Sequence, residues 1–363
     1  DGDGTTEVGV YSDGLWYLDV NGDGAWDGGD ADVHYPNFGK GVSQPCSTVA
    51  KSLHLGPEIT IGLHEYTRKD LEDHSFRITS RENYTIKNAS GTILATINAG
   101  EQTRVKYLND KNHTFRIYKS VTPEITVTDE LYFDIADGDG IFEIKKPDMD
   151  YATYRGKIKL RYSNNNSVKR IWVINELPLE QYVWGMGEIT GTGPMEYNRV
   201  MTTSYRTYGY WKILYSTKYA IEGFDVNATP GNQLYRGYDW EKRYPRIRKA
   251  AEDTRGRIVT HAGDVAITPY SSWTDGRTRN PSEVGWSTSF FPHCTSVNDP
   301  YGDYNGNYWN NSPHMSTEKL MAAGNHMVGL SAHGALTLAH DKNWDWKKIL
   351  NYYFHNIAIT SIY

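Results

Sequence analysis

The spacing of apolar residues changes at Pro178, and this change restricts the fold more than any other feature of the 363-residue chain. Upstream, short runs alternate between apolar and polar residues, which is typical of strands, at 59–63, 85–87, 92–97, 157–162 and 170–174. Downstream, apolar residues recur every three or four positions, which predicts helices over 178–190, 195–213, 243–255 and 345–354. Ser316 fits the N-cap of another short helix. Strands and helices that are segregated in this way predict an α+β fold.

The sequence predicts four segments. Residues 1–45 are rich in Gly and Asp and carry short aromatic runs typical of β-hairpins. Residues 46–57 resemble a linker that ends at Pro57. Residues 58–150 predict a β-rich part, and residues 151–363 predict a mixed domain. The chain opens on Asp1-Gly2-Asp3-Gly4 without a signal peptide, so we interpret it as a fragment of a longer precursor.

The charge and the lengths of the apolar runs argue against a nucleic-acid-binding protein and against a membrane-spanning helix. The net charge of −6 argues against a nucleic-acid-binding protein, which normally carries a basic surface. No apolar run approaches the roughly 20 residues of a membrane-spanning helix. The 28 Tyr and 11 Trp suit stacking against sugars, but they equally suit a β-rich protein with tyrosine-filled sheets. The two cysteines, Cys46 and Cys294, are too far apart for a Cys-x-x-Cys site and form either one disulfide or two free thiols.

An Asp/Gly loop near the N-terminus predicts a calcium site. Side-chain oxygens stand at loop positions one, three, five, nine and twelve, and the seventh position supplies a carbonyl: Asp19, Asn21, Asp23, Asp27, Asp30 and Ala25. Gly24 stands at the sixth position, where the chain must turn sharply. The flanks are strand-like, so the loop resembles FG-GAP-like or dockerin-like repeats, with weaker copies at 1–7 and 137–143. The alternative is a solvated acidic turn.

Glu188 is the candidate catalytic residue. Pro178 suits the first turn of a helix, whose apolar face then ends near Gly187. We therefore expect Glu188 at a helix C-terminus, where the helix dipole and partial burial favour the protonated form. A proton donor to a glycosidic oxygen needs such surroundings. The alternative is an ordinary surface carboxylate.

The stretch 176–188 is similar to the "LPLEEYVxGVGEvP" signature of the stage II sporulation protein D and LytB (amidase-enhancer) family. Further segments resemble that family's motifs in the same order, namely 196–210, 225–237, 254–259, 271–278, 326–335 and 346–353. The resemblance spans roughly residues 58–363. It implies a substrate cleft in the mixed domain and lytic transglycosylase activity on the glycan strands of peptidoglycan, with no cofactor for catalysis.

By position in these motifs, Glu188 takes the role of the acid. Arg206 and Tyr208 would shape the cleft. The remaining candidates for substrate contact or support are Gln233, Ser271, Ser272, His326 and Ser331. Each has a structural alternative: Tyr208 as a core aromatic, Arg206 as the partner of a structural carboxylate, and His326 as an interior histidine.

The chain departs from the family pattern at several positions. Asn227 and Asn232 stand where some members hold zinc with Cys and His, so a zinc site is not expected. Residues 273–275 replace small residues of a Ser/Gly loop, and Met327 and Ala332 replace Gly and Gln. These departures predict a pocket, and so a substrate fit, that differs from the family pattern.

Three functions follow as hypotheses. The first is a lytic transglycosylase, the second a non-catalytic wall protein that enhances a separate amidase, and the third a surface protein whose calcium loops are the working part. The resemblance implies peptidoglycan strands and a cell-wall amidase as partners. It also implies an extracytoplasmic location at a bacterial cell wall or surface.

Overall fold

The computed structural model describes residues 8–12, 15–19, 32–35, 55–108, 110–118, 125–128, 130–136, 140–145, 151–307 and 309–363. The chain divides into two compact units, Asp1–Lys51 and Ser52–Tyr363, and the division falls inside the predicted linker 46–57. The first unit contains an antiparallel three-stranded sheet of β1 (Val8–Ser12), β2 (Leu15–Asp19) and β3 (Asp32–Tyr35). Asp19 ends β2. The other predicted calcium ligands, Asn21, Asp23, Ala25, Asp27 and Asp30, lie outside the described residues, as does the weaker loop copy at 1–7. Of the copy predicted at 137–143, residues 137–139 also lie outside them.

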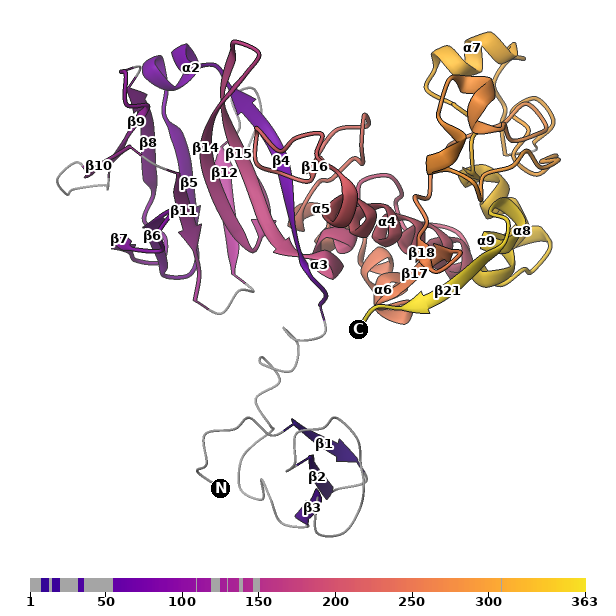
Figure 1. The fold of residues 1–363 in the computed structure, drawn as a ribbon, viewed down its shortest axis with the longest axis horizontal. Helices are drawn as coiled ribbons and strands as arrows, with labels where there is room; N and C mark the ends of the chain where they lie inside the picture. Colours follow the sequence, from indigo (N-terminus) through magenta and orange to yellow (C-terminus); the bar gives the residue numbers. More distant parts are fainter. Residues whose placement is uncertain are drawn as a thin grey trace. The chain divides into compact units, whose positions relative to one another are not determined.

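Two antiparallel sheets form the β-rich part of the second unit, shown in purple and magenta in Figure 1. The seven-stranded sheet runs in the order β16 (Val226–Asn227), β4 (Glu58–Tyr66), β15 (Val168–Pro178), β14 (Lys157–Asn165), β11 (Leu131–Asp134), β6 (Tyr84–Asn88) and β7 (Ile93–Ile97). Its one parallel pair is β16 with β4. The six-stranded sheet runs β10 (Ile125–Val127), β9 (Thr114–Tyr118), β8 (Thr103–Leu108), β5 (Phe76–Ser80), β12 (Ile141–Lys145) and β13 (Tyr151–Arg155). Helix α2 (Arg68–Asp73) begins at Thr67, which forms a capping box with Asp70.

Alternating side chains hold these sheets together. In β5, Phe76 and Ile78 are buried while Arg77 between them is directed outward. Phe76 packs against Phe133 of the other sheet, with 5.9 Å between ring centroids. Strands from both sides of residue 150 share each sheet, so the second unit is not divided at the boundary that was predicted there.

The helical part follows β15. Its helices are α3 (Leu179–Trp184), α4 (Met195–Tyr215), α5 (Tyr238–Arg243), α6 (Pro245–Asp253), α7 (Thr317–Ala322), α8 (Ala332–Asp341) and α9 (Trp346–Tyr353), with 3-10 turns at Pro281–Val284 and Thr288–Phe290. The small strands are β17 (Arg257–His261), β18 (Asp264–Val265), β19 (Tyr270–Ser271), β20 (Leu330–Ser331) and β21 (Ile357–Ser361). Helix α4 is central and contacts α3, α6, α8 and α9 (Figure 1). Ser316 caps α7 as predicted. The α+β fold class is confirmed.

The predicted helix over 178–190 is wrong in its second half, because α3 ends at Trp184. Gly185 and Gly187 allow the chain to approach another segment closely. A Cβ atom would lie 2.6 Å from a Tyr235 ring carbon at Gly185 and 2.7 Å from Arg236 Cγ at Gly187. Met186 instead forms an antiparallel bridge with Tyr235. The pairing with residues 234–236 ends the helix.

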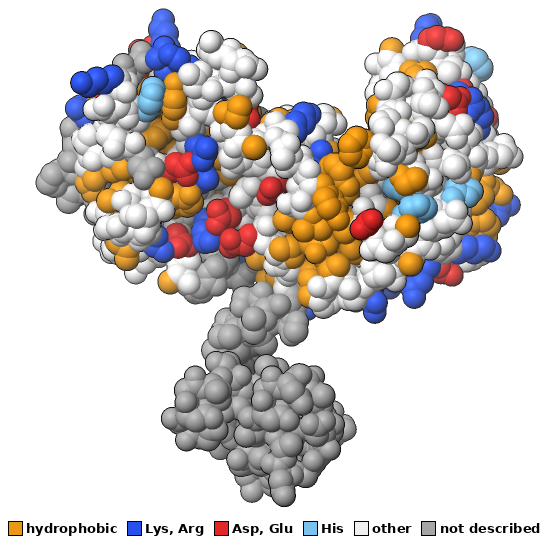
Figure 2. All heavy atoms as spheres, in the orientation of Figure 1, with side chains coloured by type: hydrophobic (Ala, Val, Ile, Leu, Met, Phe, Trp, Pro, Cys, Tyr) orange, Lys and Arg blue, Asp and Glu red, His pale blue; other side chains and the backbone are white. Residues whose placement is uncertain are grey.

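Figure 2 shows that this face of the second unit is hollowed between its β-sheet part and the part that carries α7, and that hydrophobic side chains gather below the hollow. Cys294 is a free, buried thiol, and Cys46 lies outside the described residues. Within the described ranges, no helix has the length and apolar character needed to cross a membrane.

Candidate active site

Glu188 lies in the turn after α3 and is partly buried. Its Oε1 atom accepts a hydrogen bond from the backbone N–H of Leu234 at 2.7 Å. The same two segments are joined by the Gly187 N–H, which donates to Leu234 O at 2.6 Å, and the Arg236 N–H, which donates to Gly185 O at 2.9 Å. This backbone pairing fixes the position of the Glu188 side chain.

Tyr270, from β19, is the second partner of Glu188, and its hydroxyl forms a hydrogen bond with the carboxyl group. Gln233 Nε2 donates to the Tyr270 hydroxyl at 3.4 Å, and the Tyr182 hydroxyl donates to Gln233 Oε1 at 2.8 Å. Gln233 is fully buried, so it supports Tyr270 from behind. Tyr270 was not predicted from the sequence, although it directly precedes Ser271 in a matched motif.

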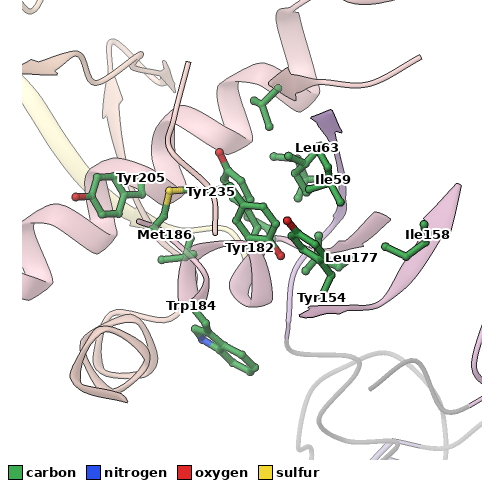
Figure 3. Packing of buried hydrophobic residues seen from close by; sticks show 14 of the residues in the cluster. Ile59, Leu63, Tyr154, Ile158, Leu177, Tyr182, Trp184, Met186, Tyr205 and Tyr235 are labelled. Atoms are coloured by element: carbon green, nitrogen blue, oxygen red, sulfur yellow. The ribbon is translucent and has the colours of Figure 1, made fainter. Parts of the chain in front are cut away.

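Aromatic rings form the interior beneath this chain of hydrogen bonds. In the view of Figure 3, Met186 of the buried cluster lies between Tyr205 on one side and Tyr182 and Tyr235 on the other. The Tyr182 and Tyr235 rings lie 5.3 Å apart, and the Tyr205 ring meets the Tyr270 ring edge-on at 5.3 Å. Burial raises the pKa of Tyr182 and of Tyr270 well above the ordinary value, so both stay neutral hydrogen-bond donors.

Burial is the main influence on Glu188 and raises its pKa, while the hydrogen bonds from Leu234 and Tyr270 lower it in part. No charged group contributes to this shift in the pKa of Glu188 among the described residues. The predicted contribution of a helix dipole is wrong, because α3 ends before Glu188 and is short. The protonated form is favoured by burial instead.

His326 lies behind Tyr270. Its Nδ1 atom accepts from the Val328 N–H at 3.0 Å, and the ring forms a second hydrogen bond with the backbone of Tyr270. Because Nδ1 is an acceptor, Nε2 carries the proton and donates to the Tyr270 carbonyl. Burial lowers the pKa of His326 to about 4, so the ring is neutral. This position favours the interior-histidine alternative, in which His326 orients Tyr270.

The three serines predicted to contact or support the substrate differ in their exposure to solvent. Ser271 Oγ accepts from the Met327 N–H at 3.2 Å, and Ser331 Oγ caps α8 by accepting from the Gly334 N–H at 3.1 Å. Both serines are buried and are paired through β19 and β20. Ser272 is exposed, and its carbonyl accepts from the His333 N–H at 3.1 Å. Only Ser272 of the three presents its side chain to solvent.

Arg206, a residue of α4, is fully buried. Its Nε and Nη2 atoms donate to the two oxygens of Glu180 at 2.7 and 2.8 Å. The Gly256 N–H also donates to Glu180 Oε1 at 2.9 Å. A side chain without solvent exposure cannot touch a glycan strand, so this position favours the structural role that the sequence left open.

Tyr208 is partly buried, and its hydroxyl accepts from Asn232 Nδ2 at 3.4 Å. Asn232 Oδ1 in turn accepts from the Asn227 N–H at 3.0 Å. The two residues that stand in place of zinc ligands therefore brace their own loop. No cluster of His, Cys, Asp and Glu suited to a metal ion occurs in the part of the chain that the structure describes.

The altered loop after Ser272 is packed into the C-terminal part. Trp273 stacks on His333, with ring centroids 3.5 Å apart and planes at 8°. Asp275 pairs with Arg279 and accepts from Thr317 Oγ1 at 2.7 Å.

Asp299 was not predicted from the sequence. It is fully buried, and it accepts hydrogen bonds from the Tyr353 hydroxyl at 2.8 Å and from Thr274 Oγ1 at 3.0 Å.

Comparison with known proteins agrees with the motifs. Residues 167–261, which include Glu188, match the SpoIID family, described as Stage II sporulation protein. A relative named "Amidase enhancer" from Bacillus subtilis (strain 168) is 30% identical over 102 residues, which are 28% of this chain. The match spans 13% of that relative's length. The predicted resemblance is therefore confirmed over this segment, which is similar to the SpoIID family and to the amidase enhancer.

Proposed function

We propose that this protein is a lytic transglycosylase that cleaves peptidoglycan between N-acetylmuramic acid and N-acetylglucosamine. The family supports a cell-wall-related role. The observation that carries the finer proposal is the state of Glu188, a partly buried carboxyl group with a raised pKa and two neutral hydrogen-bond donors. A general acid that works near neutral pH needs a pKa raised in this way. Such a substrate implies an extracytoplasmic location.

The reaction needs one carboxyl group. Glu188 transfers its proton to the glycosidic oxygen while the bond from that oxygen to the anomeric carbon breaks. The resulting carboxylate is stabilised by the Leu234 N–H and the Tyr270 hydroxyl, which are already in place. The carboxylate then takes the proton from the sugar's own 6-hydroxyl as that oxygen bonds to the anomeric carbon and closes a 1,6-anhydro ring. The proton returns to Glu188, and no second carboxylate or water is required, unlike in glycoside hydrolysis.

The test is digestion of purified glycan strands, with 1,6-anhydro products detected by mass spectrometry. The wild type should release these products and Glu188→Gln should release none. Glu252→Gln is the matched control, since Glu252 pairs with Arg248 on α6. Equal product from the wild type and Glu188→Gln, or none from either, would overturn the proposal.

The name of the relative supports a second candidate function, the enhancement of a cell-wall amidase without catalysis by this chain. The packed loop at Trp273 and Asp275 also favours it, because these side chains fill space that small residues leave open in the family pattern. Enhancement of a purified amidase on intact walls that persists in Glu188→Gln would support this function over the first.

A further inference from the structure

A hollow of about 660 Å³ opens on the β-rich part of the second unit, beside the C-terminal end of α2. Residues of β4, β5, β8 and β12 complete its walls. None of the residues around Glu188 lines it. Its volume lies in the range of ordinary ligand sites, and its lining is strongly charged.

Three cations stand in a row across neighbouring strands on one wall. Lys145 of β12 is the register partner of Arg77 of β5, and Arg77 is the register partner of Arg104 of β8. Strands lie about 4.8 Å apart, so the row is about 10 Å long. Like charges directly opposite one another destabilise a sheet, so the neighbouring Arg77 and Arg104 are unfavourable without a counter-charge.

The two arginines have no carboxylate partner within the described ranges. No ion pair or hydrogen bond engages the Arg77 guanidinium there, and Arg104 lies 5.5 Å from the centroid of the Tyr118 ring. A fourth cation of the lining, Lys106, donates to the Glu72 carbonyl at 3.3 Å. The guanidinium groups are therefore available to a ligand.

Acidic residues also line the hollow. Asp70, Asp73 and Glu65 line the same hollow, at the end of α2 and of β4. The hydrogen bond with Thr67 is the main cause that lowers the pKa of Asp70, which keeps this carboxylate ionised. Glu65 pairs with Arg170 at 3.1 Å, whereas Asp73 is exposed. The lining of the hollow thus offers groups for an anion, on β5 and β8, and groups for a cation, at the end of α2.

We propose that this hollow binds a short peptide that carries free carboxylates and a free ammonium group. Arginine recognises carboxylates through paired hydrogen bonds, which suits Arg77 and Arg104. The ammonium group would lie toward Asp70 and Asp73. A purely anionic chain would be repelled by these carboxylates, so a lining that carries both charges favours a ligand that also carries both. This inference rests on the proposed function in one respect, because the stem peptides of peptidoglycan have this chemistry.

The probe is the synthetic peptide L-Ala-γ-D-Glu-L-Lys-D-Ala, titrated into the full chain by calorimetry. One equivalent should bind, more weakly at high salt. The double variant Arg77→Gln/Arg104→Gln should weaken binding at least about tenfold, because charge-assisted hydrogen bonds are lost. Arg243→Gln, an exposed arginine of α5 outside the hollow, should bind as the wild type does. The double variant should melt at or above the wild-type midpoint, since the repulsion between Arg77 and Arg104 is relieved and no ion pair of the described residues is removed.

Absence of binding by the wild type, or equal binding by the double variant, would overturn the proposal. Tighter binding of an inorganic polyphosphate chain than of the peptide would also overturn it, by showing an anion-only site. Glu188→Gln should still bind the peptide, and the double variant should still cleave peptide-free glycan strands. A failure of the peptide site is thereby distinguished from a failure of the proposed catalysis.

Discussion

The backbone N–H of Leu234 lies 2.7 Å from Glu188 Oε1, although the two residues are 46 positions apart in the chain. The contact places a fixed donor on the carboxyl group before any substrate arrives. It supports the charged form, while burial disfavours that form. The balance between these two influences determines how Glu188 should behave with pH.

Glycan cleavage should fall as the pH rises through a midpoint above the ordinary glutamate value of 4.5, because burial raises the pKa of Glu188 and the proton donor is lost above it. A pH profile of anhydro-sugar release on defined strands measures this midpoint. A midpoint at or below the ordinary value would contradict the assignment of Glu188 as the acid.

The same shift predicts a gain in stability on substitution. A raised pKa in the folded state means that Glu188 lowers the free energy of unfolding as the pH rises from the unfolded value through the folded one. At neutral pH, the thermal midpoint of Glu188→Gln should therefore equal or exceed that of the wild type. The difference between the two midpoints should shrink as the pH is lowered. Thermal melts of both proteins at several pH values check this sign.

Tyr270→Phe should shift the alkaline limb of the activity profile to higher pH, because the hydrogen bond from this hydroxyl lowers the pKa of Glu188. The rate should also fall, by roughly 10²-fold for a lost donor to the developing charge. Tyr205→Phe is the matched control, since the buried Tyr205 hydroxyl has no hydrogen-bond partner among the described residues. An unchanged pH midpoint in Tyr270→Phe would leave Tyr270 only a packing role.

Arg206→Met should destabilise the fold by about 3–5 kcal/mol, because it leaves the buried Glu180 carboxylate without its cation. The double variant Arg206→Met/Glu180→Met should recover much of this loss, since neither charge is then buried. Urea unfolding of the two variants and of Arg243→Met measures the difference. If Arg206→Met has normal stability but binds substrate more weakly, Arg206 shapes the cleft, as the family motif predicted.

Asp299→Ala should cost about 3 kcal/mol or more, because the Tyr353 and Thr274 hydroxyls and the Gly302 N–H lose their acceptor in the interior. Asp299→Asn retains one side-chain oxygen and should cost less. Chemical unfolding at neutral pH ranks the two. An equal loss of stability in both variants would show that the negative charge of Asp299, and not its capacity to accept hydrogen bonds, stabilises this network.

Calcium binding by the first unit is a prediction from the sequence. Equilibrium dialysis at millimolar calcium should show uptake by the wild type and reduced uptake by Asp23→Ala, because the loop needs six or more oxygen ligands. Asp32→Ala, a β3 residue outside the predicted ligand set, is the control. Absence of uptake by the wild type would remove the prediction.

Local patterns predicted much of the fold. Apolar spacing placed α4 and α9 within a few residues, and Ser316 was identified as a cap from its own neighbours. The end of α3 was missed because it depends on Tyr235 and Arg236, which lie about 50 residues away. Local sequence carries no signal for such a contact.

In the candidate site, too, the sequence motifs predicted some residues, whereas the roles of others depend on contacts between distant parts of the chain. The family motifs indicated Glu188, and the structure adds the partners that tune it, Leu234 and Tyr270. Arg206 stood in a matched motif for a reason that only its burial against Glu180 reveals. Gln233 and His326 likewise support the Tyr270 position from the interior.

The short parallel pairing of β16 with β4 bears on how the protein can be shortened or recombined. Asp225, at the entry to β16, accepts from the Thr60 N–H at 2.8 Å and from Thr60 Oγ1 at 2.7 Å. A polypeptide limited to the family-matched residues 167–261 would lose β4, β14 and Tyr270 together. The matched segment is therefore not a portable module, and grafting it into another protein would transfer Glu188 without Tyr270 and without the strand that pairs with β16.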